Sequence, residues 1–306
     1  MAKVWSALFI LACSACIGFF YWLYLDDEGA LDSIKMESKS MDSHIARPDI
    51  NAETMPTAPS LDPAKSLAPP KTSNIQKPNS QKSHKKPKIA IVIDDLATPK
   101  DIQAFNSIGL KINLSLLPKH KFSIHNPKEA KKLDFYMVHL PLEANSFSQK
   151  GVKELKVGDS MEEVQAYIDE IKEHFPNLKY INNHTGSRYT ASREDMEKLL
   201  KALDKHEIIF VDSRTSSSTV VKELYEERGQ VYLHRQVFLD NEDKEEVVIK
   251  SLEKALKIAN KQGFVIAIGH PRKSTLEILK RYKQKLEMDY ELVYISELDE
   301  FLTKNK

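Results

Sequence analysis

The chain has 306 residues, of which 29% are charged, and its formal net charge at pH 7 is +1. Because acids and bases are interspersed, the sequence lacks the clustered basic excess that nucleic-acid or polyanion binding requires. A protein whose main role is to bind such polyanions is therefore excluded. The chain is long enough for one α/β domain with its own core and for further segments before it.

Residues 4–25 are uncharged and mostly apolar. A helix of about 20 such residues spans the ~30 Å hydrocarbon core of a bilayer. A lysine precedes the run and acids follow it, which predicts an uncleaved single-pass anchor in the inner membrane, with the rest of the chain in the periplasm or outside. A cleaved signal peptide is the alternative. Both cysteines, Cys13 and Cys16, lie in this run, so we expect no disulfide or thiol chemistry elsewhere.

Residues 26–87 are rich in proline, serine and lysine and lack apolar periodicity. Such a composition cannot bury enough surface to offset the entropy of ordering, so a disordered linker is predicted. We therefore divide the chain into an anchor (residues 1–25), a linker (residues 26–87) and a folded domain (residues 88–306).

In the folded domain, short apolar runs alternate with amphipathic stretches. Strands are predicted at Ile89–Ile93, Lys111–Leu116, Phe135–His139, Lys179–Asn182, Ile208–Val211, Val231–Leu233, Phe264–Ile268 and Glu291–Ile295. Helices are predicted from Ser160 to Phe175, from Ser192, from Asn241 to Lys261 and from Ser274 to Leu286. This alternation predicts a parallel sheet covered by helices, either open or closed, and seven or eight strands favour a barrel.

The first predicted strand ends in two adjacent acids, Asp94 and Asp95. Its unbroken apolar run is typical of a strand that is buried on both faces. Two neighbouring carboxylates repel each other and are costly to desolvate, so they indicate a cation or a proton-transfer role. A helix cap before Pro99 is the alternative.

Polar groups also follow the later strands, at their carboxyl ends. These groups are His139 and Glu143; Asn183, His184 and Ser187; Asp212 and Arg214; Arg235 and Asp240; and His270. A parallel sheet brings all of these ends to one edge, where α/β folds place their sites. We therefore expect one shared functional site.

The residue types of this cluster favour hydrolysis assisted by a metal. Histidine and aspartate ligands with an open position suit a divalent ion that activates a bound water, and the ligand types lead us to expect zinc. Glycine-rich phosphate loops are absent from the sequence.

The ordered motifs I-D-D-L, H-L-P-L-E, N-N-H-T-G-S, D-S-R-T, R-x-x-F-L-D and I-G-H-P resemble those of the divergent (YibQ-like) polysaccharide deacetylases. These belong to the NodB-homology superfamily of carbohydrate esterases, and the resemblance covers residues 88–306. It implies a distorted (β/α) barrel, a glycan or peptidoglycan substrate, and metal-dependent removal of N-acetyl groups.

The resemblance also implies roles for individual residues. Asp94 corresponds to the base, Asp95 to a metal ligand, and His270 to the general acid. His139 corresponds to the first histidine of the family's H-x-x-x-H motif, but Glu143 occupies the place of the second.

The third metal ligand is therefore either His184, which we prefer, or Glu143. With His184 as the ligand, the remaining residues are expected to bind substrate or support the site: Glu143, Asn183, Ser187, Asp212, Arg214, Arg235 and Asp240. There are two alternatives to this function. The chain could be a glycan-binding relative without turnover, or a metal hydrolase that acts on another amide or ester. Phe147, Tyr189 and Tyr232 are the aromatic residues near the motifs.

Overall fold

The computed structural model describes residues 85–146 and 152–306. The predicted anchor, and the linker up to residue 84, lie outside the described residues. Within the described ranges, no helix is both long and apolar enough to span a bilayer.

The described ranges contain eight strands. They are β1 (Lys88–Leu96), β2 (Ile112–Leu116), β3 (Tyr136–Leu142), β4 (Tyr180–Thr185), β5 (Ile209–Val211), β6 (Val237–Phe238), β7 (Phe264–Gly269) and β8 (Glu291–Leu292). The helices are α2 (Pro99–Asn106), α3 (Asn126–Ala130), α4 (Met161–His174), α5 (Arg193–Asp204), α6 (Val221–Glu227), α7 (Glu245–Gln262), α8 (Lys273–Asp289) and α9 (Ile295–Lys304), with a 3-10 turn at Tyr189–Ala191.

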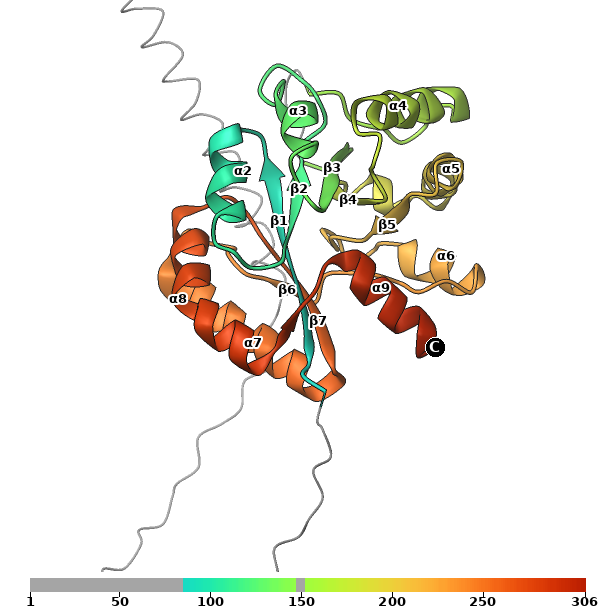
Figure 1. Ribbon diagram of the computed structural model, residues 1–306. Coiled ribbons are helices and arrows are strands. Elements are labelled where there is room, and N and C mark those ends of the chain that lie inside the picture. The colour runs from blue at the N-terminus through green and yellow to red at the C-terminus, as the bar shows by residue number, and fades with distance from the viewer. Residues whose placement is uncertain (1–84, 147–151) are drawn as a thin grey trace, which may run out of the picture. The chain divides into compact units, whose positions relative to one another are not determined.

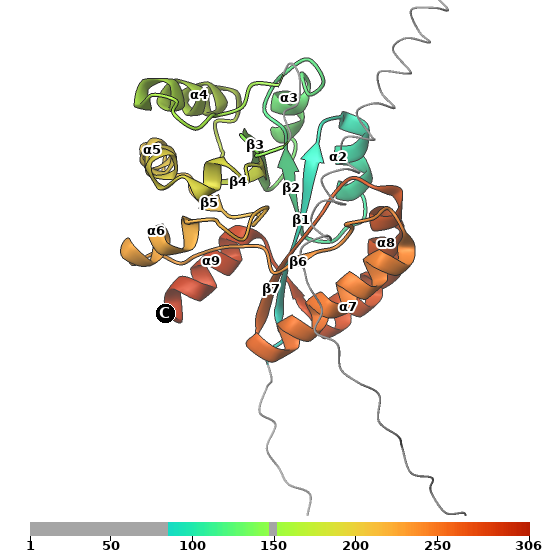
Figure 2. The ribbon, with the colours of Figure 1, turned by 180° about the vertical axis from the view of Figure 1, so that it is seen from behind.

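The strands form one parallel sheet in the order β5-β4-β3-β2-β1-β7-β6, and β8 also pairs with β1. The sheet curls into a half-barrel, and Figures 1 and 2 show helices around its outside. Its two edges approach each other at a bridge between Asp212 and His234, where Asp212 N donates to Leu233 O (3.0 Å) and Arg235 N donates to Asp212 O (2.9 Å). The predicted parallel, distorted barrel is thus confirmed as a curled parallel sheet.

Two predicted strands need correction. The sixth strand lies at Val237–Phe238, whereas Val231–Leu233 precedes the bridge and forms no strand. The last strand ends at Leu292, because Ile295 already begins α9. The predicted helix after Ser160 is confirmed: the side chain of Ser160 accepts from Glu163 N, and the Glu163 side chain accepts from Ser160 N.

Alternation along the strands divides the core in two. On β1, Ile89, Ile91 and Ile93 pack in a large cluster with the helices α2 to α8, whereas Ala90 and Val92 belong to a smaller inner cluster. The inner cluster also contains Ile295 and Leu298 of α9. The C-terminal helix therefore packs against the inner face of the sheet.

Asn113 of β2 holds α9 in place. This fully buried residue donates from Nδ2 to Ile91 O (2.9 Å) and Val293 O (3.3 Å), and its Oδ1 accepts from Ile295 N (2.7 Å). One amide thus ties β1 and β2 to the start of α9.

We predict that Asn113→Ala lowers the free energy of unfolding by about 2 kcal/mol, because it leaves buried backbone groups without partners. Urea denaturation followed by circular dichroism measures this change. The exposed Asn106→Ala is the matched control and should cost little. Equal losses in the two variants would contradict the role of Asn113.

Candidate active site

The inner face of the sheet changes from apolar to polar at the carboxyl ends of its strands. On β1, Ala90 and Val92 are followed at the same spacing by Asp94, and on β3, Met137 is followed by His139. The same alternation places Ser115, Asn182, His184, Ser213 and His270 in the polar layer. Since all strands are parallel, this layer forms one rim of the half-barrel (Figure 1).

Asp95 is the exception to this alternation. Neighbouring residues of a regular strand point to opposite faces, so Asp94 and Asp95 should diverge. Asp95 instead has a φ of +56°, and the pairing of β1 with β2 shifts between Ile93 and Leu96. This irregularity brings both carboxylates to one histidine: His139 Nδ1 lies 3.6 Å from Asp94 Oδ1, and its Nε2 lies 3.2 Å from Asp95 Oδ1.

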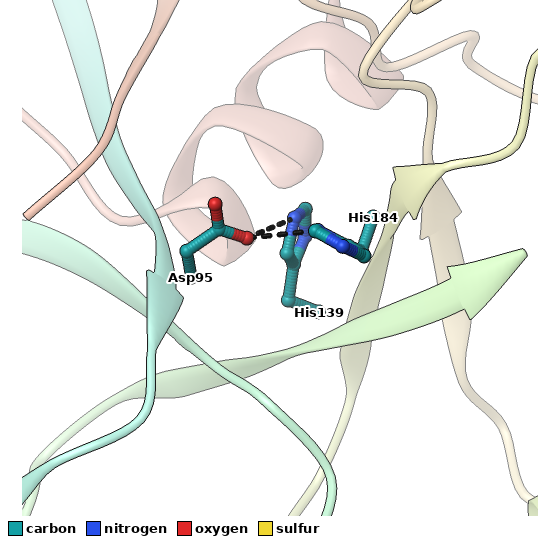
Figure 3. A group of neighbouring side chains, drawn as sticks. All are labelled: Asp95, His139 and His184. Carbon is teal, nitrogen blue, oxygen red and sulfur yellow. Dashed lines mark hydrogen bonds and ion pairs between the residues drawn. The ribbon is translucent and has the colours of Figure 1, made fainter. Parts of the chain in front are cut away.

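Asp95, His139 and His184 form a candidate metal centre. One ligand atom from each lies within 4.8 Å of the others, and Asp95 Oδ1 lies 2.9 Å from His184 Nδ1 (Figure 3). Two imidazoles and one carboxylate form a ligand set of the kind found in three-ligand catalytic zinc sites. The donor set and its convergence therefore fit a divalent ion.

The charges of this group are balanced internally. Burial alone would raise the pKa of Asp95, but His184 and His139 outweigh it and hold the pKa well below its ordinary range. Burial alone would lower the pKa of His139, yet Asp94 and Asp95 outweigh it and raise it. The group thus favours an ionised Asp95 next to the histidines.

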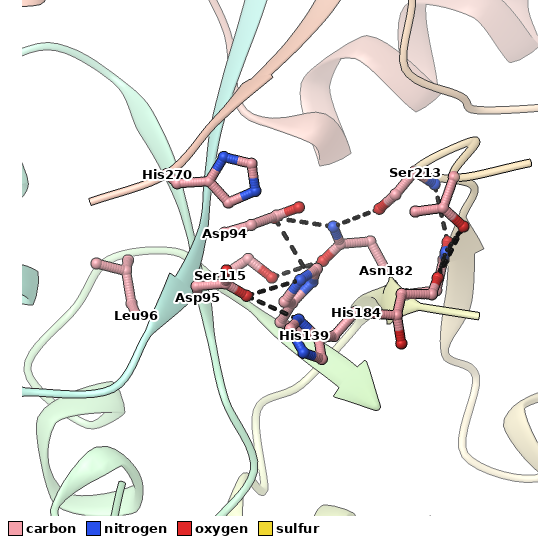
Figure 4. A network of polar contacts seen from close by, with 12 residues as sticks. Asp94, Asp95, Leu96, Ser115, His139, Asn182, His184, Ser213 and His270 are labelled. Atoms are coloured by element: carbon pink, nitrogen blue, oxygen red, sulfur yellow. Dashed lines mark hydrogen bonds and ion pairs between the residues drawn. The ribbon is translucent and has the colours of Figure 1, made fainter. Parts of the chain in front are cut away.

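Asp94 lies in a different environment, only 2% exposed. Asn182 Nδ2 donates to Asp94 Oδ1 (2.9 Å) and also to Ser213 Oγ (2.9 Å), while Ser115 Oγ donates to Asn182 Oδ1 (2.5 Å) (Figure 4). Burial raises the pKa of Asp94 despite the opposing effect of His139. The two neighbouring acids therefore differ: Asp94 binds a proton more readily than Asp95 does.

His270 is oriented by Asp240. His270 Nδ1 lies 2.8 Å from Asp240 Oδ1, while Asp240 Oδ2 accepts from His270 N (2.7 Å) and Thr275 Oγ1 (2.6 Å). A Cβ at Gly269 would lie 3.3 Å from Asp240 Oδ2, so a larger residue there would crowd this carboxylate. Burial alone would lower the pKa of His270, but its hydrogen bond to Asp240 outweighs burial and raises the pKa to about 9.

Arg235 lies beside these groups. Its Nε donates to Ser213 O (2.6 Å) and its Nη2 to Arg214 O (2.6 Å), and its guanidinium lies 3.5 Å from the ring centre of Phe238. Phe238 in turn stacks on His270 (6.0 Å between ring centres, 23°). Burial, followed by the charge of Arg214, lowers the pKa of Arg235 to about 10. Phe238 thus contacts both the Arg235 guanidinium and the His270 ring.

Glu143, the alternative third ligand, points away from the metal group. Its Oε1 pairs with Arg188 Nη1 (2.8 Å) and its Oε2 accepts from Val157 N (2.8 Å). The nearby Ser187 Oγ accepts from Asn145 N (3.0 Å). Both residues fasten loops at the rim.

Asn183, Asp212 and Arg214 support the loop after β5. Asn183 Oδ1 accepts from Ser213 N (2.9 Å), and the fully buried Asp212 accepts from Arg214 N (2.7 Å), Thr219 Oγ1 (2.9 Å) and Tyr232 OH (2.7 Å). Arg214 has an exposed side chain and a φ of +50°.

The sequence pattern missed three residues around Asp94, namely Ser115, Asn182 and Ser213. A signal for Asn182 was present: it lies two residues before His184 on β4, so the two share a face, whereas Asn183 points to the other face. Ser115 is likewise a polar residue within a strand predicted to be buried.

Comparisons with known proteins bear on the family and on the fold. A family model described as divergent polysaccharide deacetylase matches residues 91–298. An uncharacterized protein of Haemophilus influenzae is 30% identical over 213 residues, which cover 69% of this chain and 76% of that protein. Uncharacterized protein YibQ of Escherichia coli K12 is 29% identical over 213 residues, which cover 69% of this chain and 67% of that protein. The crystal structure of an uncharacterized protein from Agrobacterium tumefaciens C58 shares the fold (TM-score 0.62, 18% identity), covering 72% of this chain and 92% of that one.

We predict that Asp240→Asn lowers the pKa of His270 from about 9 toward its ordinary value of 6.5. In the wild type the folded-state pKa is raised, so the pair's contribution to stability is complete below pH 6.5 and is lost as the pH rises through about 9. NMR titration of the imidazole measures the pKa, and urea denaturation across this pH range measures the stability. An unchanged His270 pKa in the variant would contradict the assignment.

Proposed function

The chain belongs to the divergent polysaccharide deacetylase family, and from this premise we propose that it is a metal-dependent hydrolase that removes N-acetyl groups from a polysaccharide or cell-wall glycan. The observation that carries the proposal is the convergence of Asp95, His139 and His184, with Asp94 and His270 beside them. Asp95, His139 and His184 would hold the ion. When bound, a divalent ion such as zinc supplies an acidified water and polarises the acetamide carbonyl.

Asp94 is suited to act as the general base. It is buried, its Oδ1 is held by Asn182, and its raised pKa makes it a better proton acceptor than an ordinary aspartate. In the proposed reaction, the Asp94 carboxylate takes the proton of the attacking water. The separate environments of Asp94 and Asp95 allow one acid to exchange a proton while the other stays ionised.

His270 is suited to act as the general acid. With Nδ1 fixed on Asp240, its other ring nitrogen, Nε2, is the atom that gives a proton to the departing sugar amine. Figure 4 shows His270 next to Asp94. A pKa of about 9 keeps the imidazole protonated at neutral pH. The products are acetate and a free amine.

We further propose that the substrate is a glycan of the cell envelope, because the uncharged run at residues 4–25 is long enough to anchor the chain in a membrane. The linker composition of residues 26–87 would allow the domain to reach away from that membrane.

We predict that His139→Ala and His184→Ala each weaken zinc binding by roughly 100-fold or more, because each removes one of three ligands. Mass spectrometry of the purified full-length chain gives the zinc content. His206→Ala is the matched control, since His206 also pairs with a carboxylate (Asp169, 2.5 Å) but is not part of the metal group. Equal zinc content in all these proteins would refute the proposed centre.

We predict that Asp94→Asn lowers acetate release by about 10²- to 10⁴-fold while zinc content stays unchanged, because only the proton acceptor is lost. Acetate is measured with N-acetylglucosamine oligomers and with peptidoglycan as substrates. Asp134→Asn, an exposed acid before β3, is the control and should retain full activity. Zinc-loaded wild-type protein that releases no acetate from either substrate would contradict the proposed activity.

A further inference from the structure

The loop between β2 and α3, residues 117–125, lies at the rim that carries the site (Figure 1). Leu117 N donates to Leu96 O (3.0 Å), and the buried Asn126 donates from Nδ2 to Leu96 O (2.8 Å) and Leu117 O (2.9 Å). Leu96 directly follows Asp95, so these bonds hold the loop against the end of β1.

Within this loop, the ring of His120 is fixed by its Nδ1. This atom accepts from Phe122 N (3.0 Å) and Ser123 N (3.2 Å), and Ser123 is itself held by its bond from Oγ to Pro118 O (2.5 Å). A backbone N–H can only donate, so Nδ1 carries no proton. The neutral ring therefore carries its proton on Nε2.

His120 Nε2 is buried and has no hydrogen-bond partner among the described residues. The ring is near enough to His184 for the two to interact electrostatically. Because Nε2 bears the proton, it has no lone pair for a metal, and His120 is not part of the metal group. A buried donor without an acceptor is costly, so Nε2–H is suited to a ligand oxygen at the site.

Phe122 lies next to this donor. Its ring meets the His120 ring edge to face (5.5 Å between centres, 81°), and it is 57% exposed. Of the aromatic residues predicted near the motifs, Tyr189 is fully buried and Tyr232 is bound through its hydroxyl to Asp212. Phe147 lies outside the described residues. Phe122 is thus a largely exposed aromatic side chain beside His120, with Lys121 Nζ 4.5 Å from its ring centre.

We propose that His120 and Phe122 form a sugar-binding wall, in which Phe122 packs on the apolar face of a hexosamine ring and His120 Nε2–H donates to a substrate oxygen beside the acetamide. The inference rests on the proposed function and names residues that recognise its substrate. An exposed apolar ring next to an oriented polar donor matches the amphipathic surface of a pyranose.

The test measures binding of the β-1,4-linked tetramer of N-acetylglucosamine to the full-length, zinc-loaded chain by calorimetry. Asp94→Asn serves as the background, so that binding is measured without turnover. His120→Leu and Phe122→Ala should each weaken binding by about tenfold, as expected for one hydrogen bond or one aromatic contact. His120→Gln should bind more tightly than His120→Leu, because only glutamine retains an N–H near the position of Nε2.

Two matched controls and one spectroscopic readout separate recognition from loop stability. His125→Ala removes an exposed histidine of the same loop, and Met288→Ala removes a 62% exposed apolar side chain of α8; neither should change binding. The NMR signal of His120 Nε2–H should shift on addition of the tetramer. A histidine that only stabilises the loop would give no such shift.

The outcomes distinguish this inference from the proposed function. If all variants bind the tetramer equally and the wild type releases acetate, the proposed sugar-binding wall is contradicted and the proposed activity is supported. If the His120 and Phe122 variants bind more weakly but the wild type releases no acetate, the proposed sugar-binding wall is supported and the proposed activity is contradicted. Absence of tetramer binding, or an unmoved Nε2–H signal, would overturn the wall.

Discussion

The candidate site depends on one left-handed residue at the end of β1. In a regular strand, Asp94 would face the rim and Asp95 would face the helices, where a carboxylate has no partner. A φ of +56° at Asp95 turns its side chain to the same cluster, and Leu96 then pairs with Leu116 to resume the sheet. A left-handed residue costs about 1–2 kcal/mol, less for aspartate than for most residues. The contacts of Asp95 with His139 and His184 offset that cost.

The rim combines acids that would repel one another if they were alone. Each acid has its own compensating group: Asp95 has His184 and His139, Asp94 has Asn182, and Asp240 has His270. This separation gives neighbouring carboxylates opposite pKa directions, lowered for Asp95 and raised for Asp94. The polar layer thus supports different tasks within a few ångströms.

Much of the fold and of the site was predictable from sequence, because apolar runs that end in polar groups mark the strands and their shared edge. Asp95, His139 and His184 were predicted together as ligands and do lie together. The prediction of a strand at Val231–Leu233 was wrong, because this apolar run precedes a single bridge and forms no strand. Composition alone does not distinguish such a run from a strand. Neither the bulge at Asp95 nor the outward turn of Glu143 toward Arg188 leaves a signal in the sequence, since both follow from long-range packing.

The position of β1 in the sheet has a consequence for how the domain is made. Strand β1, the first of the described strands along the chain, pairs with β2 but also with β7 and β8, the last two of them. Asn113, likewise early in the domain, binds the backbone of Val293 and Ile295. The centre of the sheet therefore lacks these partners until Val293 and Ile295 have emerged. Such long sequence separations slow folding and leave apolar strands exposed during synthesis, so we expect the sheet to assemble only after β7 and β8 have been synthesised.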